Sequence, residues 1–200
     1  MDVCLWLIIS RLEFYLMEAL FTSTLSVAIA EMGDKTQLLS LLLAAKFRNK
    51  LAIIMGILVA TIINHAISAW FGVWLSKFLQ DGWGVWLLGG SFIVVGLWLL
   101  IPDKDEETDS RFDKYGAFLV STILFFLAEI GDKTQVATVL LGAQFQSTVI
   151  VTIGTTIGML IANVPVVYMG DKLMQKIPLN LTRMIAAAIF IAVGLASLLL

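Results

Sequence analysis

Long runs of apolar residues, separated by short polar stretches, occupy most of this chain of 200 residues. An apolar stretch of about 20 residues is long enough to cross the hydrocarbon core of a bilayer as a helix. The pattern therefore predicts an all-α polytopic membrane protein, with the lipid bilayer as its surroundings. The six predicted spans are Phe14–Ala45, Leu51–Ser76, Trp83–Ile101, Tyr115–Gln144, Ser147–Met174 and Arg183–Leu200.

The first and fourth of these ranges are too long for one straight crossing. About 30 residues of helix at 1.5 Å per residue measure about 45 Å, and each range carries polar residues around a glycine, Gly33 or Gly131. Backbone left unpaired at membrane depth is tolerated only where it lines a buried or watery cavity. We therefore predict that both helices are bent or broken at these glycines.

The polar residues at the two glycines form a motif that occurs twice. Glu31–Gln37 reads EMGDKTQ, and Glu129–Gln135, 98 positions later, reads EIGDKTQ. The same offset relates Gly56 to Gly154, and the register holds without a gap. We interpret the chain as a duplication of three spans. Because three is an odd number, the two copies should have opposite orientations, as in transporters built from inverted repeats.

The duplication sets the predicted boundaries along the chain. Residues 17–102 form the first repeat, 103–114 an acidic linker, and 115–200 the second repeat. Residues 1–16 form an N-terminal extension that lacks the basic start and the cleavage site of a signal peptide. This extension is either an interfacial helix or an upstream continuation of the first span.

Basic residues are distributed unevenly between the two sides of the predicted membrane. Outside the motifs, only Arg11 and Lys77 fall on one side. The residues on the other side are Lys46, Arg48, Lys50, Lys104, Arg111, Lys114, Lys172, Lys176 and Arg183. The positive-inside rule then predicts that the linker is cytoplasmic and that both termini lie on the opposite side of the membrane.

Composition excludes several other classes of protein. A net charge of −2 with 13 Lys and Arg argues against a nucleic-acid partner. Cys4 and His65 are the single cysteine and histidine, which excludes disulfide frameworks, Cys/His zinc sites and Cys–His catalytic pairs. We predict no cofactor and no enzymatic activity. Assembly into a homo-oligomer is compatible with the sequence but is not predicted by it.

The motif residues are suited to binding a hard cation. Residues three apart, such as Glu31 and Asp34, share one face of a helix, and pseudo-symmetry would bring the two motif faces together. Carboxylate and amide oxygens suit Ca²⁺, Mn²⁺ or Mg²⁺, whereas thiolate and imidazole are missing from this set. The predicted metal ligands are Glu31, Asp34, Gln37, Glu129, Asp132 and Gln135, with Lys35, Thr36, Lys133 and Thr134 as supporting residues.

The charges of the motifs favour an exchanger. Four ionised carboxylates and two lysines sum to −2, which one divalent cation neutralises. Without the ion the carboxylates would repel one another, and some should hold protons. Lys35 and Lys133 would act as counter-ions or as gates. In the structural alternative, each motif only forms a buried ion pair, such as Glu31 with Lys35, that fixes helix packing; the duplication argues against this interpretation.

Polar residues elsewhere in the spans have a simpler explanation. Asn64 and His65 lie in the middle of the second span, and Asn163 matches His65 at the repeat offset. Such residues commonly form hydrogen bonds between membrane helices. We therefore interpret them as helix–helix contacts rather than ligands.

The paired Glu-x-Gly-Asp-Lys-Thr-Gln motifs in a six-span chain of this size resemble the manganese/calcium:cation exchanger family. That family includes the Golgi and chloroplast manganese transporters and bacterial manganese exporters. The resemblance covers about residues 17–200. It implies that Glu31, Asp34, Glu129 and Asp132 bind transported Mn²⁺ or Ca²⁺, exported in exchange for H⁺ or another cation. The sequence does not distinguish Mn²⁺ from Ca²⁺.

One alternative from another functional class is an intramembrane aspartyl protease. Gly33-Asp34 and Gly131-Asp132 would then supply a catalytic pair of aspartates. Around the second aspartate, the sequence of those enzymes is similar to Gly-x-Gly-Asp. In both motifs of this chain, glutamate occupies the place of the first glycine of that pattern. The protease remains the second hypothesis.

Overall fold

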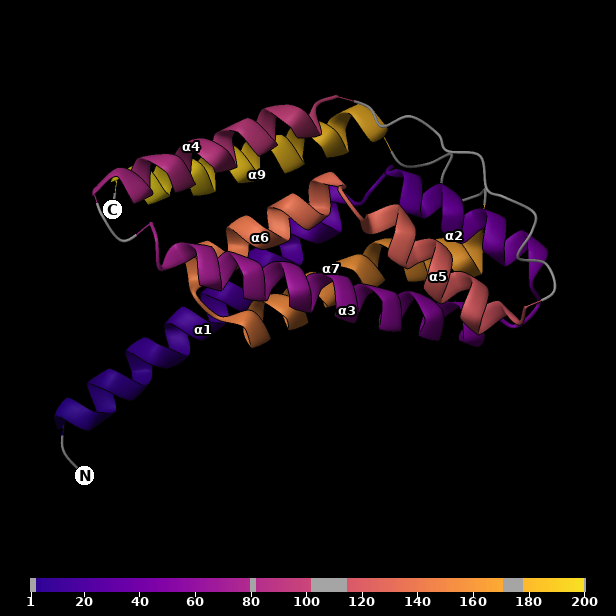
Figure 1. Ribbon diagram of the computed structural model, residues 1–200, viewed down its shortest axis with the longest axis horizontal. Helices are drawn as coiled ribbons and strands as arrows, with labels where there is room; N and C mark the ends of the chain where they lie inside the picture. Colours follow the sequence, from indigo (N-terminus) through magenta and orange to yellow (C-terminus); the bar gives the residue numbers. More distant parts are fainter. Residues whose placement is uncertain (1–2, 80–81, 102–114, 171–177, 200) are drawn as a thin grey trace.

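The computed structural model describes residues 3–79, 82–101, 115–170 and 178–199, and within these ranges its secondary-structure elements are all helices, without strands. Figure 1 shows the arrangement of the helices. They are α1 (Val3–Ala30), α2 (Lys35–Lys46), α3 (Lys50–Ser76), α4 (Gly82–Leu99), α5 (Ala117–Glu129), α6 (Lys133–Phe145), α7 (Thr148–Met169) and α9 (Leu179–Leu199). The predicted linker, residues 103–114, lies outside the described residues.

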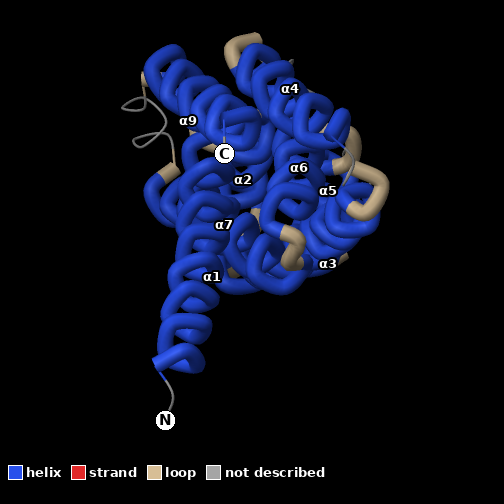
Figure 2. The backbone as a smooth tube through the Cα atoms, turned by 90° about the vertical axis from the view of Figure 1, so that its left-hand side faces the viewer, coloured by secondary structure: helices blue, strands red, loops and turns tan. Residues whose placement is uncertain are grey.

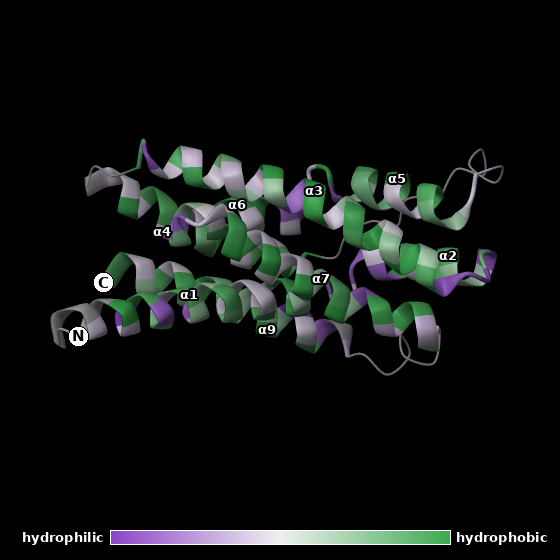
Figure 3. Ribbon diagram, turned by 90° about the horizontal axis from the view of Figure 1, so that it is seen from below, coloured by the Kyte–Doolittle hydropathy of each residue, from purple (hydrophilic) through white to green (hydrophobic). Residues whose placement is uncertain are grey.

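The apolar character of these helices is that of a multi-pass membrane protein. Five segments are long and apolar enough to cross a bilayer: Ile9–Ala30, Lys50–Ser76, Gly82–Leu99, Thr148–Met169 and Asn180–Leu199. Hydrophobic residues extend along every helix in Figure 3. Large apolar side chains also face outward, with Trp83 81% and Phe14 74% exposed. Such a surface is suited to lipid rather than water.

Both predicted helix breaks are present. The first separates α1 from α2 at Gly33, and the second separates α5 from α6 at Gly131. The φ angles of these glycines are 87° and 75°. A residue with a Cβ rarely adopts this left-handed conformation, so glycine is the residue that allows the chain to turn there.

Some predicted ends differ from the observed ones. The first helix begins at Val3, upstream of the predicted Phe14, so the described part of the extension continues α1. α9 begins at Leu179 rather than at Arg183, because Pro178 accepts the first hydrogen bonds of the helix. α7 ends at Met169 rather than at Met174, because Gly170 terminates it with a φ of 59°.

The helices pack in two groups. α3 packs against α5, α6 and α7, and α1 packs against α7. α4 and α9 lie side by side as a separate pair, which covers one side of the other helices (Figures 1 and 2). The N-terminal end of α1 projects beyond the rest (Figure 1). The residues buried between the helices include several polar ones, among them Glu31, His65, Glu129 and Asn163.

Glycines allow two of these helix pairs to approach closely. A Cβ at Gly56 of α3 would lie 2.7 Å from the carbonyl oxygen of Phe118 in α5. A Cβ at Gly154 of α7 would lie 2.9 Å from the carbonyl oxygen of Leu20 in α1. Both distances are too short for a side chain, so the two glycines permit backbone contact between the helices.

Candidate cation site

The two helix breaks have the same local structure. The Oε1 atom of Gln37 accepts a hydrogen bond from the backbone N–H of Gly33 at 2.8 Å. In the second motif, Oε1 of Gln135 accepts one from the N–H of Gly131 at 2.7 Å. Each glutamine therefore satisfies a backbone donor that the break would leave unpaired. Both amide oxygens, predicted as metal ligands, stabilise the backbone at the breaks in this structure.

Three of the four predicted carboxylates come together at the breaks. Glu31, Glu129 and Asp132 are buried, and each offers an oxygen within 4.8 Å of the oxygens of the other two. Oxygens bound to one ion at about 2.0–2.6 Å lie at most about 5.2 Å apart across that ion. Residues separated by 98 positions could therefore share a single cation.

Glu31 is held by hydroxyl groups from both motifs. Thr36 donates a hydrogen bond to Oε2 of Glu31, and Thr134 donates one to Oε1. Hydrogen bonds to a carboxylate are stronger than those between neutral groups. The two threonines, predicted as supporting residues, thus orient the Glu31 carboxylate.

The two motif lysines lie in different surroundings. Nζ of Lys35 lies 3.7 Å from Oδ1 of Asp132, so this ion pair joins one motif to the other. Lys133 is only 4% exposed; its ammonium donates to the carbonyl oxygen of Ile101 and lies 6.0 Å from the centroid of the Trp98 ring. A ring face and a carbonyl oxygen both stabilise a buried cation. Lys35 therefore contacts the carboxylate cluster.

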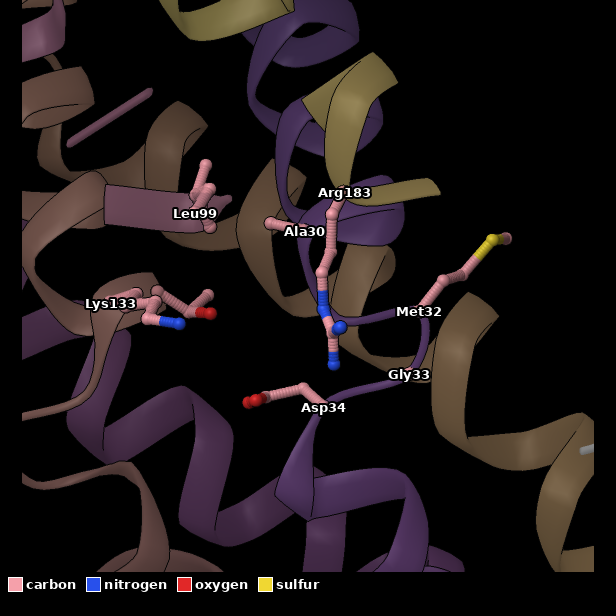
Figure 4. Close-up of a pocket in the computed structure, with 8 residues that line it drawn as sticks. Ala30, Met32, Gly33, Asp34, Leu99, Lys133 and Arg183 are labelled. Atoms are coloured by element: carbon pink, nitrogen blue, oxygen red, sulfur yellow. The ribbon is translucent and has the colours of Figure 1, made fainter. Parts of the chain in front are cut away.

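Asp34 does not join the three clustered carboxylates among the described residues. It is half-buried and lines a cleft together with Lys133, Thr134 and Arg183. Figure 4 shows the Arg183 side chain extending toward Asp34, with Lys133 on the opposite side of the cleft. Thr134 also binds Glu31, so the cleft ends next to the cluster. The sequence alone does not indicate that Arg183 lines this cleft, because its position there depends on where α9 packs.

His65, which its position in the sequence indicated as a helix–helix contact, lies beside the carboxylate cluster. It is fully buried in α3, and its Nε2 lies 3.7 Å from Oε2 of Glu129. An imidazole from outside both motifs therefore lies next to Glu129. Asn64, its neighbour in sequence, does form the predicted helix contact, donating to the carbonyl oxygen of Phe126 at 3.1 Å. The signal in the sequence was that His65 occupies the position matched by Asn163 in the other repeat.

Comparison with known proteins points to one family. The family described as "Divalent cation/proton antiporter GDT1" matches residues 19–107 and 117–200. A protein of Vibrio cholerae serotype O1 named "Putative manganese exporter" is 47% identical over 92% of each chain. GDT1-like protein 4 of Oryza sativa subsp. indica is 26% identical over 91% of this chain and 73% of its own length. GDT1-like protein 5 of Arabidopsis thaliana is 25% identical over 90% and 95%. No solved structure matches.

Proposed function

Because this chain belongs to the GDT1 family of divalent cation/proton antiporters, we propose that it exports Mn²⁺ in exchange for protons. The observation that carries this proposal is the buried cluster of Glu31, Glu129 and Asp132. Mn²⁺ is favoured over Ca²⁺ by the 47% identity to the protein named as a manganese exporter. The family is one of transporters, so the chain is not an enzyme, and the aspartyl protease hypothesis is abandoned.

The charge of the cluster supports binding of one divalent ion. Three ionised carboxylates and the ammonium of Lys35 sum to −2, which a divalent cation neutralises. The same carboxylates could take up protons once the ion has left, and this alternation is what exchange requires. A single copy of the chain supplies all three carboxylates. The proposed site therefore needs no second copy.

Asp34 would act before the ion reaches the cluster. It lines the cleft beside Thr134, whose hydroxyl binds Glu31. A cation entering the cleft would meet the Asp34 carboxylate first and then the clustered oxygens. Gln37 and Gln135 would hold the backbone at the breaks through their hydrogen bonds to Gly33 and Gly131. The same amide oxygens could also bind the ion, because a carbonyl oxygen has two lone pairs.

We further propose that the chain has six spans arranged as two inverted repeats. The span additional to the five long apolar helices, fourth in chain order, would be α5 followed by α6, which have 13 helical residues each around the second break. The equivalent close contacts of Gly56 with Phe118 and of Gly154 with Leu20 support a two-fold relation between the repeats. Gly56 and Gly154 are 98 positions apart, and so are their contact partners Leu20 and Phe118.

The orientation of the chain is part of the proposal. The excess of Lys and Arg after the first, third and fifth spans favours periplasmic termini and a cytoplasmic linker, in a bacterial inner membrane. A cysteine introduced at position 108 of a variant lacking Cys4 should resist an impermeant thiol reagent in intact cells. It should react after the membrane is permeabilised. Labelling in intact cells would contradict this orientation.

The transport proposal is tested with purified protein in liposomes. An imposed Mn²⁺ gradient should drive proton movement in the opposite direction, reported by a pH-sensitive dye trapped in the lumen. An imposed pH gradient should likewise drive Mn²⁺ uptake. Protein-free liposomes are the control. Mn²⁺ movement that leaves the lumenal pH unchanged would contradict proton exchange, and the absence of Mn²⁺ movement would contradict the proposed substrate.

A further inference from the structure

We propose that His65 provides a nitrogen ligand to the transported ion, on the Glu129 side of the cluster, and thereby favours Mn²⁺ over Ca²⁺. This inference rests on the proposed transport function. It adds a ligand that lies outside both repeated motifs, on α3 rather than at a helix break. It also assigns a cause to metal selectivity, which the oxygen ligands alone do not determine.

The position of the imidazole carries the inference. His65 is 0% exposed, and neither ring nitrogen has a hydrogen-bond partner among the described residues. Its Nε2 faces Oε2 of Glu129 at 3.7 Å, and both Glu129 oxygens also lack hydrogen bonds there. Two atoms bound to one ion at about 2.0–2.6 Å are at most about 5.2 Å apart. A cation can therefore bind both side chains.

The matched position in the other repeat shows what a purely structural residue does there. Asn163 accepts a hydrogen bond from Ser40 at 2.8 Å and donates one to the carbonyl oxygen of Met159 at 3.1 Å. Thr138, the counterpart of Ser40, donates to the backbone of Thr134 at 2.8 Å. Helix packing therefore engages the polar atoms of Asn163 but leaves the ring nitrogens of His65 available.

Buried polar groups without partners are unfavourable, and a bound ion would satisfy them. The neutral imidazole offers a lone pair on one ring nitrogen. Ca²⁺ and Mg²⁺ take oxygen ligands, whereas transition-metal ions also accept imidazole nitrogen. One nitrogen among several carboxylate oxygens should therefore strengthen Mn²⁺ binding without strengthening Ca²⁺ binding.

The single histidine of the chain makes a direct spectroscopic test possible. Wild-type protein, purified through a tag that contains no histidine, is loaded with Mn²⁺ and measured by pulsed electron paramagnetic resonance. Coordination should give ¹⁴N modulation of the echo. This modulation should be replaced by a ¹⁵N signal when only histidine is labelled with ¹⁵N. No substitution is needed, so failure of a variant to fold cannot obscure the result.

The matching variant is His65→Asn, which installs the residue of the other repeat. The ¹⁴N modulation should disappear, Mn²⁺ affinity should fall by about tenfold or more, and Ca²⁺ affinity should stay within about twofold because Ca²⁺ prefers oxygen. Asn163→Ala is the control: it removes hydrogen bonds at the matched position, and it should keep both the nitrogen signal and the Mn²⁺/Ca²⁺ affinity ratio.

The outcomes separate this inference from the transport proposal. Bound and transported Mn²⁺ without a histidine nitrogen signal would overturn the role of His65 and leave the proposed function intact. An equal loss of Mn²⁺ and Ca²⁺ affinity in His65→Asn would also overturn it, since a packing defect affects both ions alike. If the wild type neither bound nor moved Mn²⁺, both proposals would fail.

Discussion

The two motifs are nearly identical in sequence, but their glutamates lie in different surroundings. Glu31 accepts hydrogen bonds from the hydroxyls of Thr36 and Thr134. Glu129 has no hydrogen bond among the described residues and lies beside His65. Both threonines therefore serve the same glutamate, although one of them belongs to the other motif. A duplicated motif has produced a cluster whose two halves differ.

The aspartates and lysines extend this contrast. Asp132 is buried next to Lys35, whereas Asp34 is half-buried in the cleft that Arg183 also lines. The cause lies in the residues around the motifs, because the position matched to Arg183 is Val85. One half of the cluster is thus closed by hydrogen bonds, and the other faces an imidazole.

The largest expected effect tests whether the two halves share one ion. Glu31→Gln and Glu129→Gln should each abolish exchange, although they lie 98 residues apart. Removing one charge from a buried ionic cluster costs about 3–5 kcal/mol, equivalent to more than about 100-fold in affinity. Mn²⁺ flux into liposomes measures the loss. The linker substitution Thr108→Ala is the control, and wild-type flux in either glutamine variant would contradict a shared site.

A smaller effect should reveal the asymmetry of the hydroxyl groups. Thr134→Val and Thr36→Val each remove a hydrogen bond to Glu31. Because such bonds to charged groups contribute about 1.5–3 kcal/mol, each variant should lose at least about tenfold in Mn²⁺ affinity. Thr→Ser at the same positions keeps the hydroxyl and should retain binding. If Ser lowered affinity as much as Val, keeping the hydroxyl would not preserve binding, and loss of the hydrogen bond to Glu31 would not explain the effect.

Substitution of the motif lysines should have a still smaller effect on transport. Lys35→Gln removes the partner of Asp132 and should weaken transport by about fivefold, the upper end for a partly exposed ion pair. Lys133→Gln removes the ammonium that contacts Ile101 and Trp98, and it should also weaken transport. Concentration-dependent flux measures both variants.

Arginine variants sharpen the lysine comparison. If Lys35 and Lys133 only balance charge, Lys→Arg at each position should preserve transport, because arginine keeps the charge. Equal losses in the arginine and glutamine variants would instead indicate that the shape of the ammonium matters, since the guanidinium has a different geometry.

The smallest effect concerns stability and uses another matched pair of residues. Asn49 caps α3 by accepting a hydrogen bond from Ala52 at 3.1 Å, and Ser147 caps α7 by accepting one from Ile150 at 3.4 Å. Asn49→Ala should cost about 1 kcal/mol. Ser147→Ala should cost about half as much, because its bond lies near the distance limit. Thermal unfolding in detergent measures both, and the Mn²⁺/Ca²⁺ affinity ratio should not change.

Much of this protein follows from its sequence alone. The apolar runs predict membrane helices because a bilayer requires them, and the observed helices begin and end near most of the predicted limits. Gly33 and Gly131 predicted the breaks, since charged residues and glycine in a long apolar run are unfavourable in an unbroken helix. The same charges identified the carboxylates of the candidate site, because ionisable residues at membrane depth are costly without a function.

Only the tertiary structure decided which of these residues meet. His65 and Arg183 lie far from both motifs along the chain, and the packing of α3 and α9 brings them to Glu129 and to the Asp34 cleft. The offset of 98 predicts equal halves, whereas the structure gives both threonine hydroxyls to Glu31. Sequence spacing specifies which residues share a helix face. The partner across that face depends on how neighbouring helices pack. The sequences of the two repeats differ at enough positions, such as His65 and Asn163, to make the two halves unequal.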